Sequence, residues 1–173
     1  MRINRVAAAY LMIAAILAGF AVALVAVVSA KATVGAPPDL IRPVIALVVL
    51  TAIVALMMGV YRNVAVIRGA VPARYFRSFT SDSPAEWVER PARAYMNLLE
   101  LPVLFYVVCL LMLTTGRFDS VQVALAWVFV AARCAHAFIH IAFNYVPLRF
   151  AAFVAGVATL TVIWTRFAEQ NLR

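Results

Sequence analysis

Ionisable and amide side chains interrupt one long apolar segment of this sequence at helical spacing. Arg93, Asn97 and Glu100 follow one another at i, i+4 and i+7, so they share one face of a helix. A charge at membrane depth costs roughly 2.5–3.5 kcal/mol and seldom faces lipid. We therefore expect this face to contact protein, water or a polar ligand.

A second polar face lies in the next apolar segment, where Arg133, His136 and His140 stand at i, i+3 and i+7. The helix rise from Arg93 to Glu100 is about 10 Å, and the rise from His140 back to Arg133 is the same. Consider two antiparallel helices in which Arg93 lies level with His140. Glu100 and Arg133 would then lie side by side. We predict an ion pair between them, which would fix which helices are neighbours.

Arginines beside the apolar segments indicate a site for an anion. Arg62, Arg93 and Arg149 each stand at the end of such a segment. Taken singly, each is more often a residue that reaches toward lipid phosphate. Three arginines at one membrane level, together with Asn97 and His140, would instead form a basic pocket. Such a pocket suits a small polyanion, because the planar guanidinium binds both oxygens of a carboxylate.

The histidines and cysteines do not indicate a metal site. His136 and His140 are the only histidines, and the further ligands that zinc or haem needs are lacking. Hydrogen-bonded imidazoles are therefore favoured. Cys109 and Cys134 have no Cys-x-x-Cys spacing and lie within apolar segments, so we interpret them as small core residues.

The composition indicates an integral membrane protein. Of the 173 residues, 66% are apolar and 13% are charged, whereas about a quarter of the residues of a soluble domain are charged. Five apolar segments are long enough to cross about 30 Å of hydrocarbon, at residues 6–30, 43–61, 94–114, 121–143 and 150–165. The predicted fold is an all-α membrane bundle.

The distribution of basic residues predicts an orientation. Segment 62–93 is the only long polar connection and holds six arginines, so by the positive-inside rule it is cytoplasmic. The N-terminus is then cytoplasmic as well. The net charge of +8 follows from topology and anionic lipid rather than from nucleic-acid binding. Within the segment, Ser83-Pro84-x-Glu86 predicts a helix start with serine as the cap.

The first apolar segment is too long for the core of a cleavable signal, which usually has about 7–15 residues. We interpret it as an uncleaved span. The expected organisation is therefore an N-terminal transmembrane helix with a short loop at residues 1–42, followed by a four-helix membrane domain at residues 43–173.

With these residues located, the chain resembles the MAPEG family, the membrane-associated proteins of eicosanoid and glutathione metabolism. The resemblance covers about residues 43–168, and its most specific part is Arg93-Ala-x-x-Asn97-x-x-Glu100. The other matching features are Gly59-x-x-Arg62, Glu89-Arg90, Arg133-x-x-His136 and Arg149. The usual family unit has four helices, so the first span looks like an N-terminal addition. The resemblance is to a bacterial-type member, for which we expect an inner-membrane location.

The resemblance implies a homotrimer of helical bundles that binds glutathione, as a co-substrate, in a cytoplasm-facing cleft between protomers. Glutathione contacts would be Arg62, Arg93, Asn97, Glu100 and His140; Arg133 and His136 would form an interior polar network; and Arg149 would be catalytic, beside the sulfur. A cation there stabilises the thiolate, which is the nucleophilic form of a thiol. The implied activity is that of a glutathione transferase or peroxidase acting on lipophilic electrophiles that arrive from the bilayer.

Three residues depart from the family's pattern. Met96 stands where some members carry arginine, His140 where many carry tyrosine, and Phe153 where some carry a tyrosine hydroxyl. Because the family also includes non-catalytic members, the alternative function is a lipid-binding or scaffold protein whose arginines meet anionic headgroups. A transporter or channel is disfavoured, since the five spans show no internal repeat and the ionisable face is confined to two helices.

Overall fold

The computed structural model describes residues 2–73, 75–78 and 85–172, and within these ranges every regular element is a helix. The elements are α1 (Arg2–Val28), α2 (Pro37–Ile67), α3 (Tyr75–Ser78), α4 (Glu86–Thr115), α5 (Ser120–Ala142) and α6 (Val146–Asn171). All but the short α3 are long and apolar enough to cross a membrane. The predicted all-α membrane bundle with five spans is confirmed.

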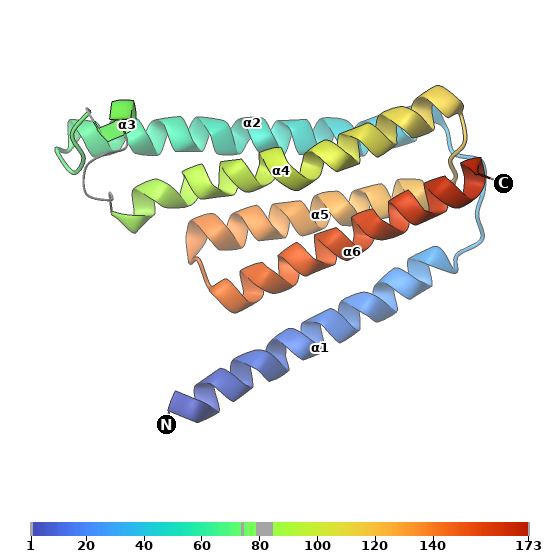
Figure 1. The fold of residues 1–173 in the computed structure, drawn as a ribbon, viewed down its shortest axis with the longest axis horizontal. Coiled ribbons are helices and arrows are strands. Elements are labelled where there is room, and N and C mark those ends of the chain that lie inside the picture. The colour runs from blue at the N-terminus through green and yellow to red at the C-terminus, as the bar shows by residue number, and fades with distance from the viewer. Residues whose placement is uncertain (1, 74, 79–84, 173) are drawn as a thin grey trace.

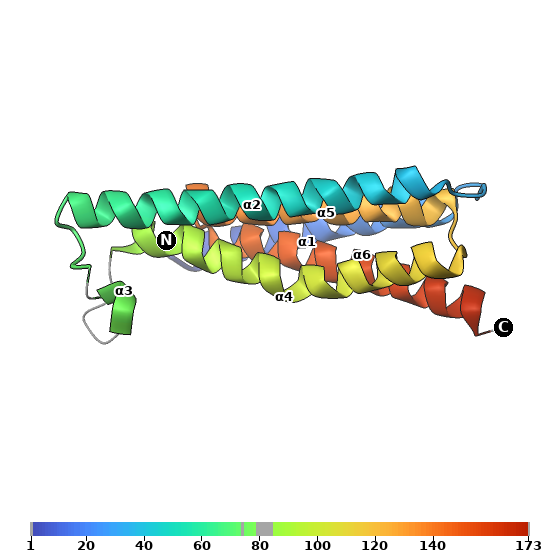
Figure 2. The ribbon, with the colours of Figure 1, turned by 90° about the horizontal axis from the view of Figure 1, so that it is seen from above.

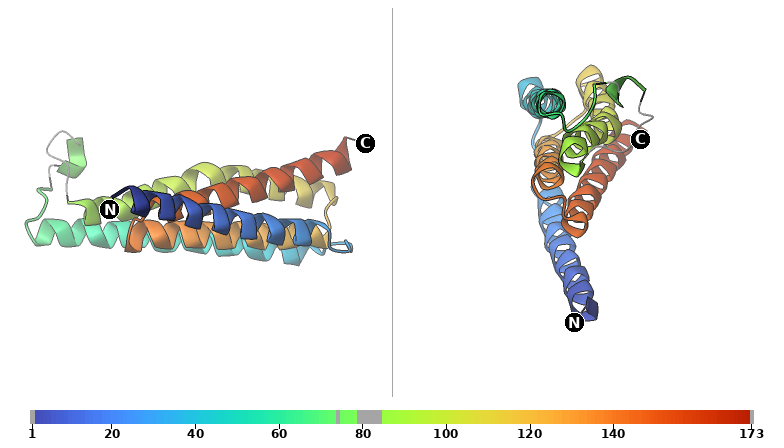
Figure 3. Two further views of the ribbon diagram at one scale, coloured as in Figure 1. Left: turned by 90° about the horizontal axis from the view of Figure 1, so that it is seen from below. Right: turned by 90° about the vertical axis from the view of Figure 1, so that its left-hand side faces the viewer.

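Four of the long helices form the bundle, and α1 stands partly apart from it (Figure 1). Helix α2 packs mainly on α4, and α5 packs mainly on α6. The view along the bundle in Figure 3 shows α1 projecting away from the other helices toward its N-terminus. Among the described side chains of α1, Leu24, Val27 and Val28 pack against the main core.

The contact between α2 and α4 follows from a seven-residue repeat. A repeat of seven keeps one side of a helix turned toward its neighbour, and α2 buries Leu40, Leu47 and Val54 at this spacing. Helix α4 buries residues at the same spacing, namely Leu98, Phe105 and Met112. Phe105 also stacks on Phe129 of α5, with ring centroids 4.7 Å apart, so one aromatic contact joins the two helix pairs.

The helices continue beyond the apolar segments that predict them. Helix α2 runs past residue 61 to Ile67, and α4 begins at Glu86 rather than near residue 94. An apolar segment marks the part of a helix in hydrocarbon, whereas backbone hydrogen bonding continues into the headgroup region. The predicted cap Ser83 lies outside the described residues, and Ala85 occupies the N-cap position of the described helix.

The two ends of the bundle differ. One end carries the connection from α2 through α3 to α4 together with the α5–α6 turn, and α3 lies beside the end of α2 (Figure 2). At the opposite end, Asp119 caps α5 and forms a capping box with Gln122. Asp119 also accepts a hydrogen bond from Arg166 of α6 at 2.8 Å, so one acidic side chain joins α5 to α6 at this end.

Candidate functional site

The turn between α5 and α6 places Arg149 against the end of α5. Asn144 adopts a left-handed conformation with φ of 49°, and its N–H donates to the Ile139 carbonyl at 2.8 Å. Asparagine tolerates this conformation better than most residues. Helix α6 then starts with proline in its first turn. The guanidinium of Arg149 therefore lies within reach of His140, on the preceding helix.

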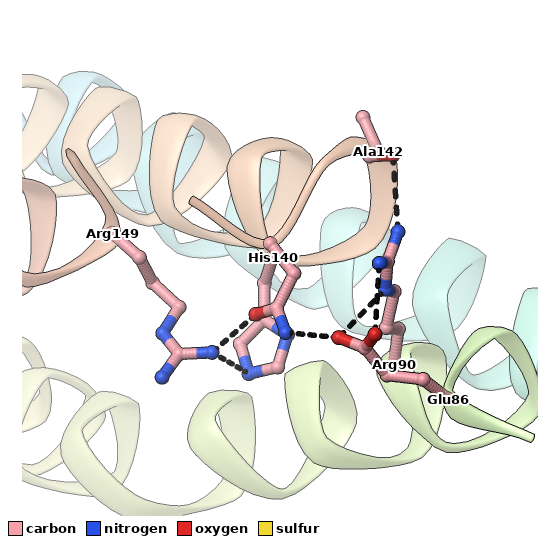
Figure 4. Close-up of polar contacts among 6 residues, drawn as sticks. Glu86, Arg90, His140, Ala142 and Arg149 are labelled. Atoms are coloured by element: carbon pink, nitrogen blue, oxygen red, sulfur yellow. Dashed lines mark hydrogen bonds and ion pairs between the residues drawn. The ribbon is translucent and has the colours of Figure 1, made fainter. Parts of the chain in front are cut away.

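The half-buried guanidinium of Arg149 is held by two neutral acceptors (Figure 4). Its Nη1 donates to Asn144 Oδ1 and lies 3.3 Å from His140 Nε2. Because a guanidinium only donates, His140 accepts at Nε2 and carries its proton on Nδ1. Within the described ranges, Arg149 has no carboxylate partner. Its positive charge thus remains available to an anion.

A pocket of about 230 Å³ lies beside this guanidinium. It brings together residues of three helices, including four that the sequence analysis singled out, and its lining is Asn97, His136, His140, Val146, Arg149, Phe150 and Phe153. Both histidines are at least nine-tenths buried, with 5% of His136 and 3% of His140 exposed. The pocket therefore combines one cation with two enclosed imidazoles.

Each of these histidines has one ring nitrogen without a partner. His136 Nδ1 lies 3.1 Å from the Arg149 carbonyl, which can only accept, so the proton is on Nδ1. His136 Nε2 and His140 Nδ1 are buried and have no hydrogen-bond partner among the described residues. Buried polar atoms without partners are uncommon in folded proteins. Here they mark a place where a polar ligand or water would complete the hydrogen bonding.

Arg62, Arg93 and Glu100 do not line this pocket. The Arg62 guanidinium lies 5.4 Å from the centre of the Phe76 ring, which packs against a small apolar cluster at the ends of α2 and α4. Arg93 and Glu100 have exposed side chains on α4. Asn97 does reach the pocket, while its amide donates to the Arg93 carbonyl at 2.8 Å. A single chain therefore assembles only part of the predicted polyanion site.

The predicted ion pair between Glu100 and Arg133 is wrong within this chain. Glu100 is exposed on α4, whereas Arg133 is buried, with 1% of the residue exposed. Arg133 Nη2 instead donates to the carbonyls of Ala152 and Phe153, each at 3.2 Å. Helix rise predicts the depth of two residues but not the rotation of their helices, and here α6 rather than α4 faces Arg133.

A glycine of α6 provides the space for Arg133. A Cβ at Gly156 would overlap the Arg133 guanidinium. The guanidinium carbon also lies 5.4 Å and 5.6 Å from the ring centres of Phe129 and Phe153, within the range of cation–π contact. Arg133 Nε and Nη1 are buried without a partner among the described atoms. Arg133 is thus held by carbonyls and aromatic rings rather than by a carboxylate.

Glu86 and Asn144 take part in the contacts around Arg149, although no pattern in the sequence predicts them as site residues. Glu86 Oε1 accepts from Asn144 Nδ2 at 2.6 Å, and Glu86 pairs with Arg90 at 3.2 Å. Arg90 also donates to the Ala142 carbonyl at 3.4 Å, so the start of α4 holds the α5–α6 turn (Figure 4). The spacing of Glu86 and Arg90 predicts their pairing on one helix. No local pattern predicts the contact with Asn144.

The comparison with known families agrees with the fold. The model of the MAPEG family matches residues 40–168, which include all four helices of the bundle except the end of α6 and the first residues of α2. No curated protein and no solved structure matches the chain. Helix α1 lies outside the matched residues. The chain belongs to the MAPEG family.

Proposed function

We propose that this protein is a membrane-bound glutathione transferase or peroxidase that acts on lipophilic electrophiles. The observation that carries the proposal is the guanidinium of Arg149, which lines a pocket and has no carboxylate partner among the described residues. A cation beside a thiol stabilises the thiolate, and the thiolate is the nucleophile in conjugation. Membership of a family that includes glutathione-dependent enzymes supports the same reaction class.

The pocket residues fit parts of glutathione, which carries two carboxylates, an ammonium group, two amides and the thiol. Arg149 can stabilise a negative sulfur. Asn97 offers an amide at the wall of the pocket, and His136 has an enclosed nitrogen with a lone pair for an N–H or S–H donor. In conjugation, the thiol proton leaves to water, the sulfur forms a bond to the electrophilic carbon, and the leaving group takes the electron pair.

A second copy of the chain would supply the remaining contacts. Arg93 and Glu100 are charged and exposed on a membrane-spanning helix, and such residues seldom face lipid. We infer that their face of α4 meets a neighbouring protomer in a homotrimer. Arg62, Arg93 and Glu100 would then contact glutathione at the boundary between protomers. Arg133 would remain a structural residue in the interior.

The proposed orientation puts the pocket near the cytoplasm. The α5–α6 turn, from which Arg149 follows, lies at the same end of the bundle as the arginine-rich connection between α2 and α4 (Figure 1). By the positive-inside rule this end faces the cytoplasm. Glutathione would enter from the aqueous side. The apolar electrophile would arrive from the bilayer, and we propose the bacterial inner membrane as the location.

A non-catalytic lipid-binding or scaffold role is the second candidate. The exposure of Arg93 at the end of a span favours it, because an exposed arginine at this depth can reach lipid phosphate. The two functions differ in what Arg149 must do. An enzyme requires its charge at the bound thiol, whereas a scaffold requires no thiol at all.

Calorimetry of the detergent-solubilised protein with glutathione tests the proposal. We expect wild-type protein to bind glutathione, and Arg149→Ala to bind it more weakly and to lose conjugation of a chromogenic electrophile. Arg42→Ala is the matched control, because Arg42 is an exposed arginine at the other end of the bundle and pairs only with Asp39. Absence of glutathione binding by wild-type protein at millimolar concentrations would contradict the enzyme and favour the second candidate.

A further inference from the structure

Asn144 stands between a carboxylate and a guanidinium that come from different helices. Its Nδ2 donates to Glu86 Oε1 of α4 at 2.6 Å, and its Oδ1 accepts from Arg149 Nη1 of α6. Figure 4 shows Glu86 and Arg149 on opposite sides of this contact. Glu86 and Arg149 form no ion pair with each other. One neutral amide therefore links the start of α4 to the cation of the pocket.

An amide in this position can orient the Arg149 guanidinium without neutralising its charge. A carboxylate in direct contact would pair with Arg149 and compete with any anionic ligand. Asn144 offers only a carbonyl dipole, so the guanidinium is oriented while its net charge stays uncompensated. The charge of Glu86 is instead balanced by Arg90, whose nitrogen lies 3.2 Å from the carboxylate.

The backbone at residue 144 limits which side chains can perform this task. Its φ of 49° lies in the left-handed region, which glycine, asparagine and aspartate adopt most readily. Among these three, glycine lacks the amide and aspartate would bring a negative charge to Arg149. Asparagine is the one that closes the turn and also presents a neutral acceptor.

We propose that Asn144 is a positioning residue that holds the Arg149 guanidinium at the pocket and leaves its charge free for an anionic ligand. Glu86 aligns the amide, so the position of Arg149 depends on the first turn of α4. The identification of that ligand as glutathione rests on the proposed function. The position of Arg149 itself does not, and it can be measured without glutathione.

The test uses Asn144→Gly and Asn144→Asp in the full-length protein, with modification of Arg149 by phenylglyoxal followed by peptide mass spectrometry. Loss of the amide in Asn144→Gly frees the guanidinium, so Arg149 should react faster. The carboxylate in Asn144→Asp pairs with the guanidinium, so Arg149 should react more slowly. Asn63→Gly is the matched control, because Asn63 is exposed on α2 and its amide donates only to the Gly59 carbonyl. Equal rates at Arg149 in wild-type protein and both Asn144 variants would overturn the proposal.

Glutathione binding supplies the second readout. Both Asn144 variants should bind glutathione roughly tenfold more weakly than wild-type protein, the scale of one charge-assisted hydrogen bond. Glu86→Gln keeps an oxygen for Asn144 Nδ2 and should retain more binding than Glu86→Ala. If wild-type protein binds no glutathione but the modification rates change as expected, the proposed function fails and the positioning role stands. If wild-type protein binds glutathione and both Asn144 variants match it, the positioning role fails alone.

Discussion

The guanidinium of Arg133 occupies the space where a side chain at residue 156 would lie, so Gly156 and Arg133 form one packing unit between α5 and α6. Without this space, the Arg133 Nη2 atom could not reach the carbonyls of Ala152 and Phe153. A buried arginine that spans two helices in this way requires a small residue opposite it. The packing of α5 on α6 around Arg133 therefore depends on residue size at position 156.

Gly156→Ala should destabilise the bundle by about 1–3 kcal/mol, because the added methyl group must displace a buried guanidinium. Gly59→Ala is the control, since a Cβ there meets nothing within 4 Å and alanine favours helix. Thermal unfolding in detergent measures both. In protein that already carries Arg133→Ala, we expect the further change Gly156→Ala to have little effect on the unfolding midpoint. Equal midpoints for the Gly156 and Gly59 variants would contradict this packing.

Asp119→Ala should destabilise the protein by about 1–3 kcal/mol, because one change removes the cap of α5 and the contact with Arg166 of α6. Its side chain is 15% exposed, so water compensates little. The control is Asp39→Ala, whose ion pair with Arg42 is exposed and should contribute at most about 1 kcal/mol. Thermal midpoints compare the two variants. A larger effect at Asp39 than at Asp119 would refute the role given to this cap.

Sequence spacing predicts the spans and the polar faces of this protein, but not how the helices are rotated against each other. The spans follow from the length of apolar segments. Asn97, His136 and His140 meet Arg149 in one pocket because each lies on the polar face that its spacing indicates. Glu100 is exposed on α4 and forms no ion pair with the buried Arg133.

The sequence pattern also does not predict the contacts that involve the segments connecting the helices. Glu86 and Asn144 are 58 residues apart, and neither belongs to an amphipathic pattern. Their contact arises because α4 starts well before its apolar segment and reaches the α5–α6 turn. Arg62 does not join the basic pocket expected with Arg93 and Arg149. Its guanidinium lies instead against the ring of Phe76, in the segment that follows α2.

We propose that the four-helix domain predicted at residues 43–173, together with the start of α2 from Pro37, holds together without α1. Among the described side chains, those of α1 that pack against the core are partly buried, and none of them lines the pocket beside Arg149. Inserting a protease site between Ala30 and Lys31 allows the purified protein to be cut after it has folded. We expect the cut protein, after the α1 fragment has been separated from it, to keep its oligomeric state and its affinity for glutathione. Loss of the folded state on cutting would show that α1 is part of the same unit.

Arg93→Ala should abolish conjugation with little effect on thermal stability, because the side chain is exposed in one chain and is proposed to act at the boundary between protomers. Arg117→Ala serves as the control, since Arg117 is exposed at the opposite end, where it donates to the Gln170 carbonyl. Initial rates with a chromogenic electrophile measure the effect. Full activity in Arg93→Ala would show that Arg93 is not part of the proposed glutathione site.

The central claim is that the charge of Arg149 stabilises the thiolate of bound glutathione. Ultraviolet absorbance of the thiolate, followed against pH at saturating glutathione, measures this directly. The bound thiol should ionise at a lower pH than free glutathione in wild-type protein and in Arg149→Lys, which keeps the charge. In Arg149→Leu it should ionise near the pH of the free thiol. A bound thiol that ionises at the same pH in wild-type protein and in Arg149→Leu would contradict the claim.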